Sequence, residues 1–445
     1  MGDFVVGVGN KFFIPRIAVG GPPNPTWADF EQTDTTWYDV SPSLSPQAIP
    51  WITGVRIDDN HALIAYHGSN FGDLRVAVIN VPTAGTPITV VDEVDVTQSI
   101  FGRRVQLALS PIGNTGQYLL TGQSFVAISG QSRVRALVLT ADSSSVSVGN
   151  FFDLADTPNG GTSFATMLDD TFGIQVYQLN VGGSTSQVPY ANCFELTGNP
   201  ISGSIIRMNA ERLSSNSFQF TGPSQPPIPL NSRSALIPLR DTVSGGIDPV
   251  FAGYAVVRIN DDGTRNFDTI REVLNKNVSF FEGTVLNTQA GSPEIYHLGG
   301  LGRETSPAEL NPTHNQLTNQ IASVSTTTTL DFPAFDLLTT AIPSGIFSPD
   351  SEDWTMVSVT VDTNTSVTPL RVGIWEFDPT TKVPSLSKVQ TVNDSNGGSF
   401  RLQGGSSSTT ELIEMSQGRL LVLSQCDEGG SSQSDNFVGA TLLTV

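Results

Sequence analysis

The stretches HALIAYH, residues 61–67, and LRVAVINV, residues 74–81, decide how the rest of the chain is interpreted. Each has the length of one strand, and each is apolar at nearly every position instead of at every second one. Such a strand is expected where a sheet is covered on both faces. A further strand-like run at residues 52–57 precedes them, so this region predicts three consecutive strands of one buried sheet.

This three-strand pattern occurs seven times, with a period of roughly 60 residues, which indicates one repeated supersecondary unit. The second strands are predicted to begin near His61, Gln117, Phe172, Ser232, Glu294, Trp354 and Arg419. The third strands are predicted at residues 74–81, 134–141, 190–196, 254–259, 320–329, 370–377 and 437–445. The first strands are predicted at residues 52–57, 103–109, 163–168, 217–221, 277–281, 341–347 and 399–402.

The repeat predicts an all-β chain with a single seven-bladed β-propeller over residues 35–445. The last unit ends after its third strand, and residues 35–40 (TTWYDV) have the composition of a strand. We therefore expect this N-terminal strand to complete and close the last blade, since closure removes exposed sheet edges. The alternative is an unrelated strand in a surface arm. The apolar residues of segment 268–275 have helical spacing, and the sequence is compatible with either a helix or an outer strand in this segment.

Residues 1–34 are expected to form a short N-terminal arm. Its apolar runs at residues 4–8 and 12–19 precede GGPPNP, which can continue neither a helix nor a central strand. Such an apolar arm must cover a surface, either its own propeller or a partner. We predict an assembly arm that docks on a partner through Phe4, Phe12, Phe13 and Ile14.

Charge and composition narrow the possible partners. The charged fraction is 14% and the net charge is −20, so nucleic acid and anionic membranes are poor partners. The N-terminus lacks a basic signal region, and no apolar stretch approaches the ~18 residues of a membrane span. The excess of acidic over basic residues is compatible with a location on a particle surface, with a saline medium or with a basic protein partner.

The sequence predicts no enzyme, no cofactor and no metal site. It contains four histidines, and Cys193 and Cys426 are expected to be small core residues instead of a disulfide. Residues 260–263 (NDDG) resemble part of a calcium loop, but a hairpin turn is favoured because Asn, Asp and Gly tolerate positive φ. Residues 348–354 are similar to a sialidase Asp-box at Ser348 and Asp350, although Glu352 replaces its glycine.

Two loops between second and third strands are predicted to be long, at residues 240–253 and 302–319. Long irregular loops in a compact repeat often bind ligands or partners. The alternative is a tolerated surface insertion. The second loop supplies the candidate binding residues Arg303, Glu304, Glu309, His314 and Asn315.

With its diverged blades rich in Gly, Ser and Thr and its few lysines, the chain resembles β-propeller structural or attachment proteins of tailed bacteriophage virions. The resemblance implies a non-enzymatic tail, fibre or capsid-associated component, assembled in the host cytoplasm in multiple copies. It implies other virion proteins as partners, with a host-surface glycan or receptor as a further ligand. The alternative is a polysaccharide-binding or glycoside-processing propeller, which would be extracellular.

Overall fold

A computed structural model of the chain describes residues 6–8, 11–13, 38–40, 52–67, 74–83, 86–96, 107–126, 131–158, 163–180, 187–197, 204–207, 211–213, 222–223, 226–240, 251–260, 264–267, 271–275, 278–286, 294–301, 310–317, 324–329, 341–347, 355–362, 370–377, 384–392, 399–400, 410–416, 419–427 and 436–444. Within these ranges the regular elements are all β-strands, and no helix is long and apolar enough to cross a membrane.

The described strands form one two-stranded sheet and seven larger antiparallel sheets, named I to VII in chain order. The inner strands are β4 Ile52–Arg56, β8 Leu107–Pro111, β12 Ser163–Met167, β17 Gly222–Pro223 with β18 Ile228–Asn231, β23 Val278–Leu286, β27 Ala341–Phe347, and β31 Ser399–Phe400 with β32 Thr410–Ser416. The second strands are β5 His61–His67, β9 Gln117–Val126, β13 Phe172–Asn180, β19 Ser234–Arg240, β24 Glu294–Leu301, β28 Thr355–Asp362 and β33 Arg419–Asp427.

The third strands are β6 Leu74–Asn80, β10 Gln131–Ala141, β14 Gln187–Thr197, β20 Phe251–Ile259, β25 Leu310–Leu317, β29 Leu370–Phe377 and β34 Asn436–Thr444. The outer strands are β7 Thr89–Val96, β11 Val146–Pro158, β15 Ser204–Arg207 with β16 Glu211–Arg212, β21 Arg265–Phe267 with β22 Arg271–Asn275, β26 Val324–Thr329, β30 Pro384–Val392 and, in sheet VII, β3 Tyr38–Asp39.

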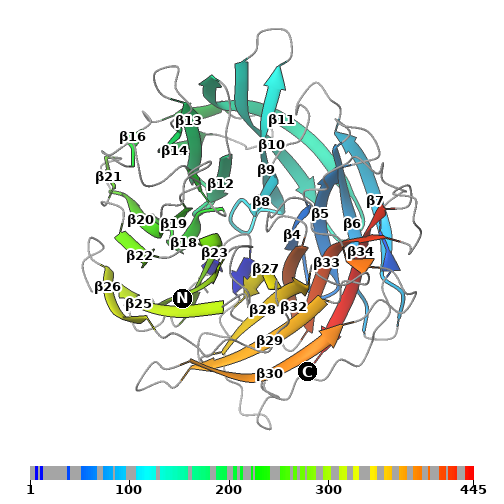
Figure 1. The fold of residues 1–445 in the computed structure, drawn as a ribbon. Helices are drawn as coiled ribbons and strands as arrows, with labels where there is room; N and C mark the ends of the chain where they lie inside the picture. The colour runs from blue at the N-terminus through cyan, green and yellow to red at the C-terminus, as the bar shows by residue number, and fades with distance from the viewer. Residues whose placement is uncertain are drawn as a thin grey trace, which may run out of the picture.

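The larger sheets surround a common centre, with their inner strands toward it (Figure 1). Inner strands of successive sheets lie next to one another in the order β4, β8, β12, β18, β23, β27 and β32, and β32 lies next to β4 again. This is the arrangement of blades in a β-propeller.

The second strands of sheets I, II and III each pack on two neighbouring sheets, as their apolar sequences predicted. In β5, Ala62 and Ile64 belong to a core cluster shared with sheet VII, whereas Leu63 and Ala65 belong to a cluster shared with sheet II. Alternate side chains of a strand point to opposite faces, so both faces of sheet I are buried. The continuous apolar run of HALIAYH therefore reflects burial on both sides.

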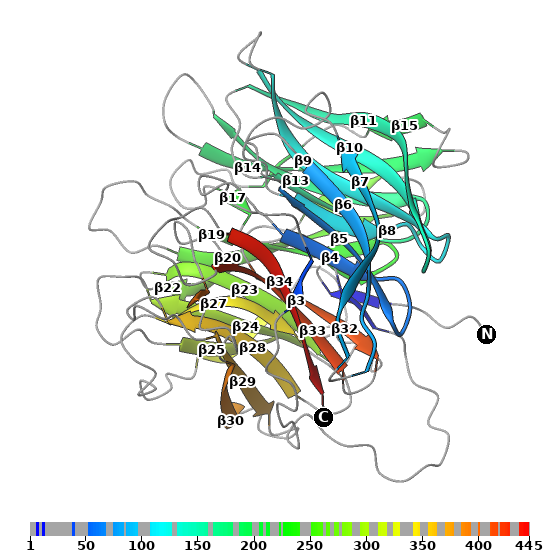
Figure 2. The same ribbon diagram turned by 90° about the vertical axis from the view of Figure 1, so that its right-hand side faces the viewer.

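The predicted closure by an N-terminal strand is confirmed. Tyr38 and Asp39 in β3 pair with Ala440 and Gly439 in β34, and the Val40 amide donates to the Val438 carbonyl at 3.0 Å. Figure 2 shows β3 beside β34. The strand supplies the outer position of sheet VII, which the C-terminal part of the chain leaves unfilled.

Sheets VII and I also approach closely at their inner strands. A Cβ atom on Gly54 in β4 would lie only 2.6 Å from Ile413 Cδ1 in β32. Both strands contribute to one buried cluster, which includes Ile52 and Met415. The first and last sheets are therefore joined by tight apolar packing as well as by β3.

Sheets II, V and VII differ from their predicted strands. The first strand of sheet II, predicted at residues 103–109, is β8 and extends to Pro111. In sheet V the prediction of a third strand at residues 320–329 is wrong, because β25 is the third strand and β26 the outer one. In sheet VII only β31 falls within the predicted first strand, and the longer inner strand is β32.

Each of the two inner strands of sheet IV contains one proline, Pro223 in β17 and Pro229 in β18. Residues 217–221, predicted as its first strand, lie outside the described residues, and β18 pairs with β19 in the inner position. Proline is tolerated there because one edge of an inner strand has no neighbouring strand. Of the two alternatives for residues 268–275, the outer strand is correct, since β22 pairs with β20.

The hairpin prediction for residues 260–263 is also confirmed at its described ends. Ile259 pairs with Arg265, and the Asn260 amide donates to the Thr264 carbonyl at 2.7 Å. Residues 261–263 lie outside the described residues. Cys193 is buried in β14, as expected for a core residue; Cys426 lies in β33.

Deleting residues 1–40 should strongly lower the melting temperature or cause aggregation, because the edge of β34 loses β3. A chain that lacks only residues 1–34 retains β3 and is the matched control. Thermal denaturation and size-exclusion chromatography of the two truncations measure the effect. If the two truncated chains have the same melting temperature, β3 does not hold the ring closed.

Candidate functional site

A repeated turn joins the first and second strands on one face of the ring. In sheet I the Ile57 amide donates to the His61 carbonyl at 2.8 Å, and in sheet III the Leu168 amide donates to the Phe172 carbonyl at 2.7 Å. The carbonyl just before the second strand then accepts an amide at the end of the third strand or directly after it. This bond recurs in four sheets, as Val81 to Asn60, Ala141 to Gly116, Leu196 to Thr171 and Ile259 to Arg233.

Asp58 stabilises the turn of sheet I. Its Oδ1 accepts the Asn60 amide at 2.8 Å and lies 2.8 Å from His61 Nδ1. Burial opposes ionisation, but the Asn60 amide and the His61 ring together hold the pKa of Asp58 below its ordinary 3.8. Burial, and then the charge of Asp58, raises the pKa of Tyr118 in sheet II to about 12.

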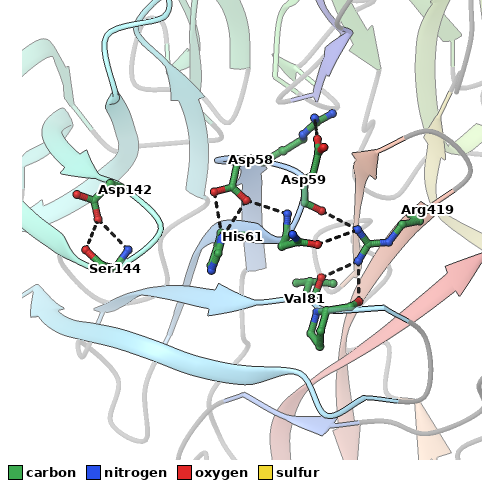
Figure 3. Close-up of polar contacts among 10 residues, drawn as sticks. Asp58, Asp59, His61, Val81, Asp142, Ser144 and Arg419 are labelled. Carbon is green, nitrogen blue, oxygen red and sulfur yellow. Dashed lines mark hydrogen bonds and ion pairs between the residues drawn. The ribbon is translucent and has the colours of Figure 1, made fainter.

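Arg419 joins the last sheet to the first across this turn (Figure 3). Nη1 donates to the Asp59 carbonyl at 2.8 Å and to Asn60 Oδ1 at 3.2 Å; Nη2 donates to the Val81 and Pro82 carbonyls, each at 2.6 Å. Burial lowers the pKa of Arg419, and the charge of Asp59 partly offsets this. These four bonds, named here the Arg419 clamp, fix β33 to the turn between β4 and β5 and to the segment directly after β6.

Hydroxyl groups connect neighbouring inner strands. Thr53 Oγ1 in β4 accepts the Leu109 amide of β8 at 3.3 Å, and Ser110 Oγ in β8 accepts the Met167 amide of β12 at 2.9 Å. All of these positions lie in the buried inner layer. The polar side chains of this layer therefore hold successive sheets together.

A second polar network lies in sheet I, on the side of the closing strand. The Tyr66 hydroxyl donates to one carboxylate oxygen of Glu93, and Arg75 donates to the other. Arg75 also lies 3.8 Å from Asp95. Burial, and then the bond to Glu93, raises the pKa of Tyr66, and the negative charge of Asp39 on β3 adds to this increase.

These arrangements bind parts of the chain to one another. Asp58, Asp142 and Asp169 each accept backbone amides of their own turns, and Asp142 is shown with Ser144 in Figure 3. In the part of the chain that the structure describes, no three His, Cys, Asp or Glu residues group so that they could hold a metal ion.

The predicted loop site is only partly described. Arg303, Glu304 and Glu309 lie outside the described residues. The prediction that His314 and Asn315 lie in a loop is wrong, because both belong to β25, opposite Tyr296 and Ile295 of β24. The binding role of the candidate residues stays a prediction.

The N-terminal arm contains a hairpin of β1 Val6–Val8 and β2 Lys11–Phe13, which places Phe12 and Phe13 in β2. In this structure β1 lies next to β18, and β2 lies next to β4 and β32. Phe4 and Ile14 lie outside the described residues. Docking of the arm on a partner stays a prediction.

The sequence interpretation missed Asp58 and Arg419. Asp58 carried a detectable signal, because IDDN at residues 57–60 and LDDT at residues 168–171 stand at the same place before their second strands. Arg419 carried none, since its acceptors lie 337 to 360 residues away in the chain.

Searches with protein-family models and among curated proteins find no match. Among similar solved structures, an α-L-arabinofuranosidase from Fusarium graminearum is 10% identical, with 93% of this chain and 98% of that chain covered and a TM-score of 0.45. The NanB sialidase from Streptococcus pneumoniae is 9% identical, with 86% of this chain and 83% of that chain covered and a TM-score of 0.43. The WD40 domain of SCAP from fission yeast is 10% identical, with 95% of this chain and 96% of that chain covered and a TM-score of 0.42. At these identities and TM-scores the likenesses say nothing about activity or ligand. The β-propeller assignment rests on the sheet order described above.

Replacing Asp58 by Asn should lower the free energy of unfolding at neutral pH by less than about 1 kcal/mol, since the carboxylate is partly exposed. The folded pKa of Asp58 lies below its unfolded value, so its stabilising effect is present above about pH 4 and is lost as pH falls through the folded pKa. Urea unfolding of both proteins at several pH values measures the difference. A difference that stays constant down to about pH 2 contradicts this role.

Replacing Arg419 by Ala should destabilise the fold by about 2–3 kcal/mol, because four acceptors lose a charged donor. Lysine retains the charge but lacks the planar fork, so Arg419→Lys should be intermediate. Arg258→Ala, at an exposed position of β20, is the control. Equal unfolding free energies for Arg419→Ala and Arg258→Ala would show that the Arg419 clamp does not stabilise the fold.

Proposed function

We propose that the chain is a closed seven-bladed β-propeller that works as a non-enzymatic structural protein of a tailed-phage virion. Its place would be a tail, fibre or capsid-associated component, present in multiple copies. The observation that carries the proposal is the double connection between sheets VII and I, through β3 and through the Arg419 clamp. A ring without ends is a rigid platform on which other proteins can assemble.

The described charged side chains bind other parts of the chain, which supports a structural role for the protein. Asp58 and Asp169 stabilise turns, Glu93 is held by Tyr66 and Arg75, and Arg419 joins two sheets. Groups committed in this way contribute to a rigid ring. Catalytic acids and bases, in contrast, must be free to exchange protons with a substrate.

The surface charge indicates what kind of partner fits. A net charge of −20 favours basic protein surfaces over phosphate backbones. We assign host-surface recognition, of a glycan or receptor, to the long sequence segments 241–250 and 302–309, which stand between the second and third strands in chain order.

The proposal is tested by removing the gene from the phage genome and supplying a tagged chain in trans. The tagged chain should be recovered in purified particles by mass spectrometry, and particles made without it should lack a component or fail to adsorb. A chain without residues 1–25 should stay folded and enter particles less efficiently. Normal particles without the protein, together with glycoside hydrolysis by the purified chain, would instead establish the enzymatic alternative.

A further inference from the structure

Sheet III contains a pair of buried amides that face sheet II. Gln175 in β13 and Asn192 in β14 are direct cross-strand partners, with exposures of 0% and 3%. Asn192 Nδ2 reaches the carbonyl of Leu154 in β11 of sheet II, at 3.5 Å. Phe194, two residues from Asn192, lies in the cluster shared by the two sheets. The two amides therefore lie between sheets II and III.

Other sheets have no amide pair at this place. The residue equivalent to Gln175, the fourth of its second strand, is Ile64 in sheet I, Leu120 in sheet II, Ile237 in sheet IV and Val422 in sheet VII. Their cross-strand partners are Ala77, Leu137, Ala255 and Thr441. Among these five sheets, only sheet III has an amide side chain on both strands at this position.

The amides leave three buried polar atoms without a protein partner. These are Oε1 and Nε2 of Gln175 and Oδ1 of Asn192. The neighbouring hydroxyl of Thr121 is already engaged, since it accepts the Ala165 amide and donates to the Ala108 carbonyl, each at 3.3 Å. Buried polar groups of folded proteins are nearly always paired, with protein or with ordered water.

The donor and acceptor pattern identifies the ligand. Two carbonyl oxygens accept and one amide NH₂ donates, which matches a water molecule that donates twice and accepts once. A cation would be opposed by the NH₂ group, and an anion by the two carbonyl oxygens. Buried waters typically make about three such bonds. Ala165, opposite Gln175 in β12, adds little bulk beside the amide.

We propose that sheets II and III enclose at least one long-lived water molecule, bound by Gln175 and Asn192. The water makes this interface a hydrated contact between blades, whereas the equivalent strand pair of sheet I is apolar. The site depends only on the packing of sheets II and III, so it is independent of the function proposed above.

A structure of the unchanged protein at high resolution tests the site directly. An ordered water within about 2.7–3.2 Å of Asn192 Oδ1 and of the Gln175 amide supports it. A direct hydrogen bond between the two amides, with no water, overturns it. This measurement does not depend on the folding of any variant.

Solution measurements test the same site with variants. Oxygen-17 relaxation dispersion counts long-lived internal waters, and the double variant Gln175→Leu/Asn192→Ala, which imitates the apolar pair of sheet I, should lose at least one. Gln178→Leu alters a buried glutamine that faces away from sheet II on the same strand, and it should keep the count of the unchanged protein. An unchanged count in the double variant would overturn the proposal.

Discussion

Burial of both faces of a sheet, observed for sheets I to III, is the constraint on which the fold depends. A strand such as HALIAYH can be apolar throughout only if a neighbouring sheet lies on each side. A row of such sheets cannot end without exposing two apolar faces, so the first and last sheets must meet. The interface between sheets VII and I is therefore the place where the two ends of the chain are needed together.

Three kinds of interaction close that interface. The main-chain bonds of β3 fill the outer position of sheet VII, while Ile413 packs against Gly54 at the inner position. The Arg419 clamp binds main-chain carbonyls of the turns of sheet I. Sheets VII and I are thus joined by main-chain pairing, by apolar packing and by a charged donor, each at a different distance from the ring centre.

Polar groups in the inner layers have a consistent use. Thr53 and Ser110 accept amides of the next inner strand, so a small hydroxyl can hold two sheets without adding a charge. Asn192 also joins two sheets, through the Leu154 carbonyl, and the proposed water pairs the amide atoms that remain.

The sequence by itself determined the repeat, the strands of sheets I and VI and the closing strand, because these rest on local apolar runs and on one missing strand. It failed at β25, whose residues LNPTHNQL are mostly polar and include a proline, and at β18, a four-residue strand that contains Pro229. The turn acids could have been recognised from the repeated IDDN and LDDT. Only the tertiary structure decided the Arg419 clamp and the amide pair, because their partners lie in other sheets and no local pattern encodes a contact between distant segments.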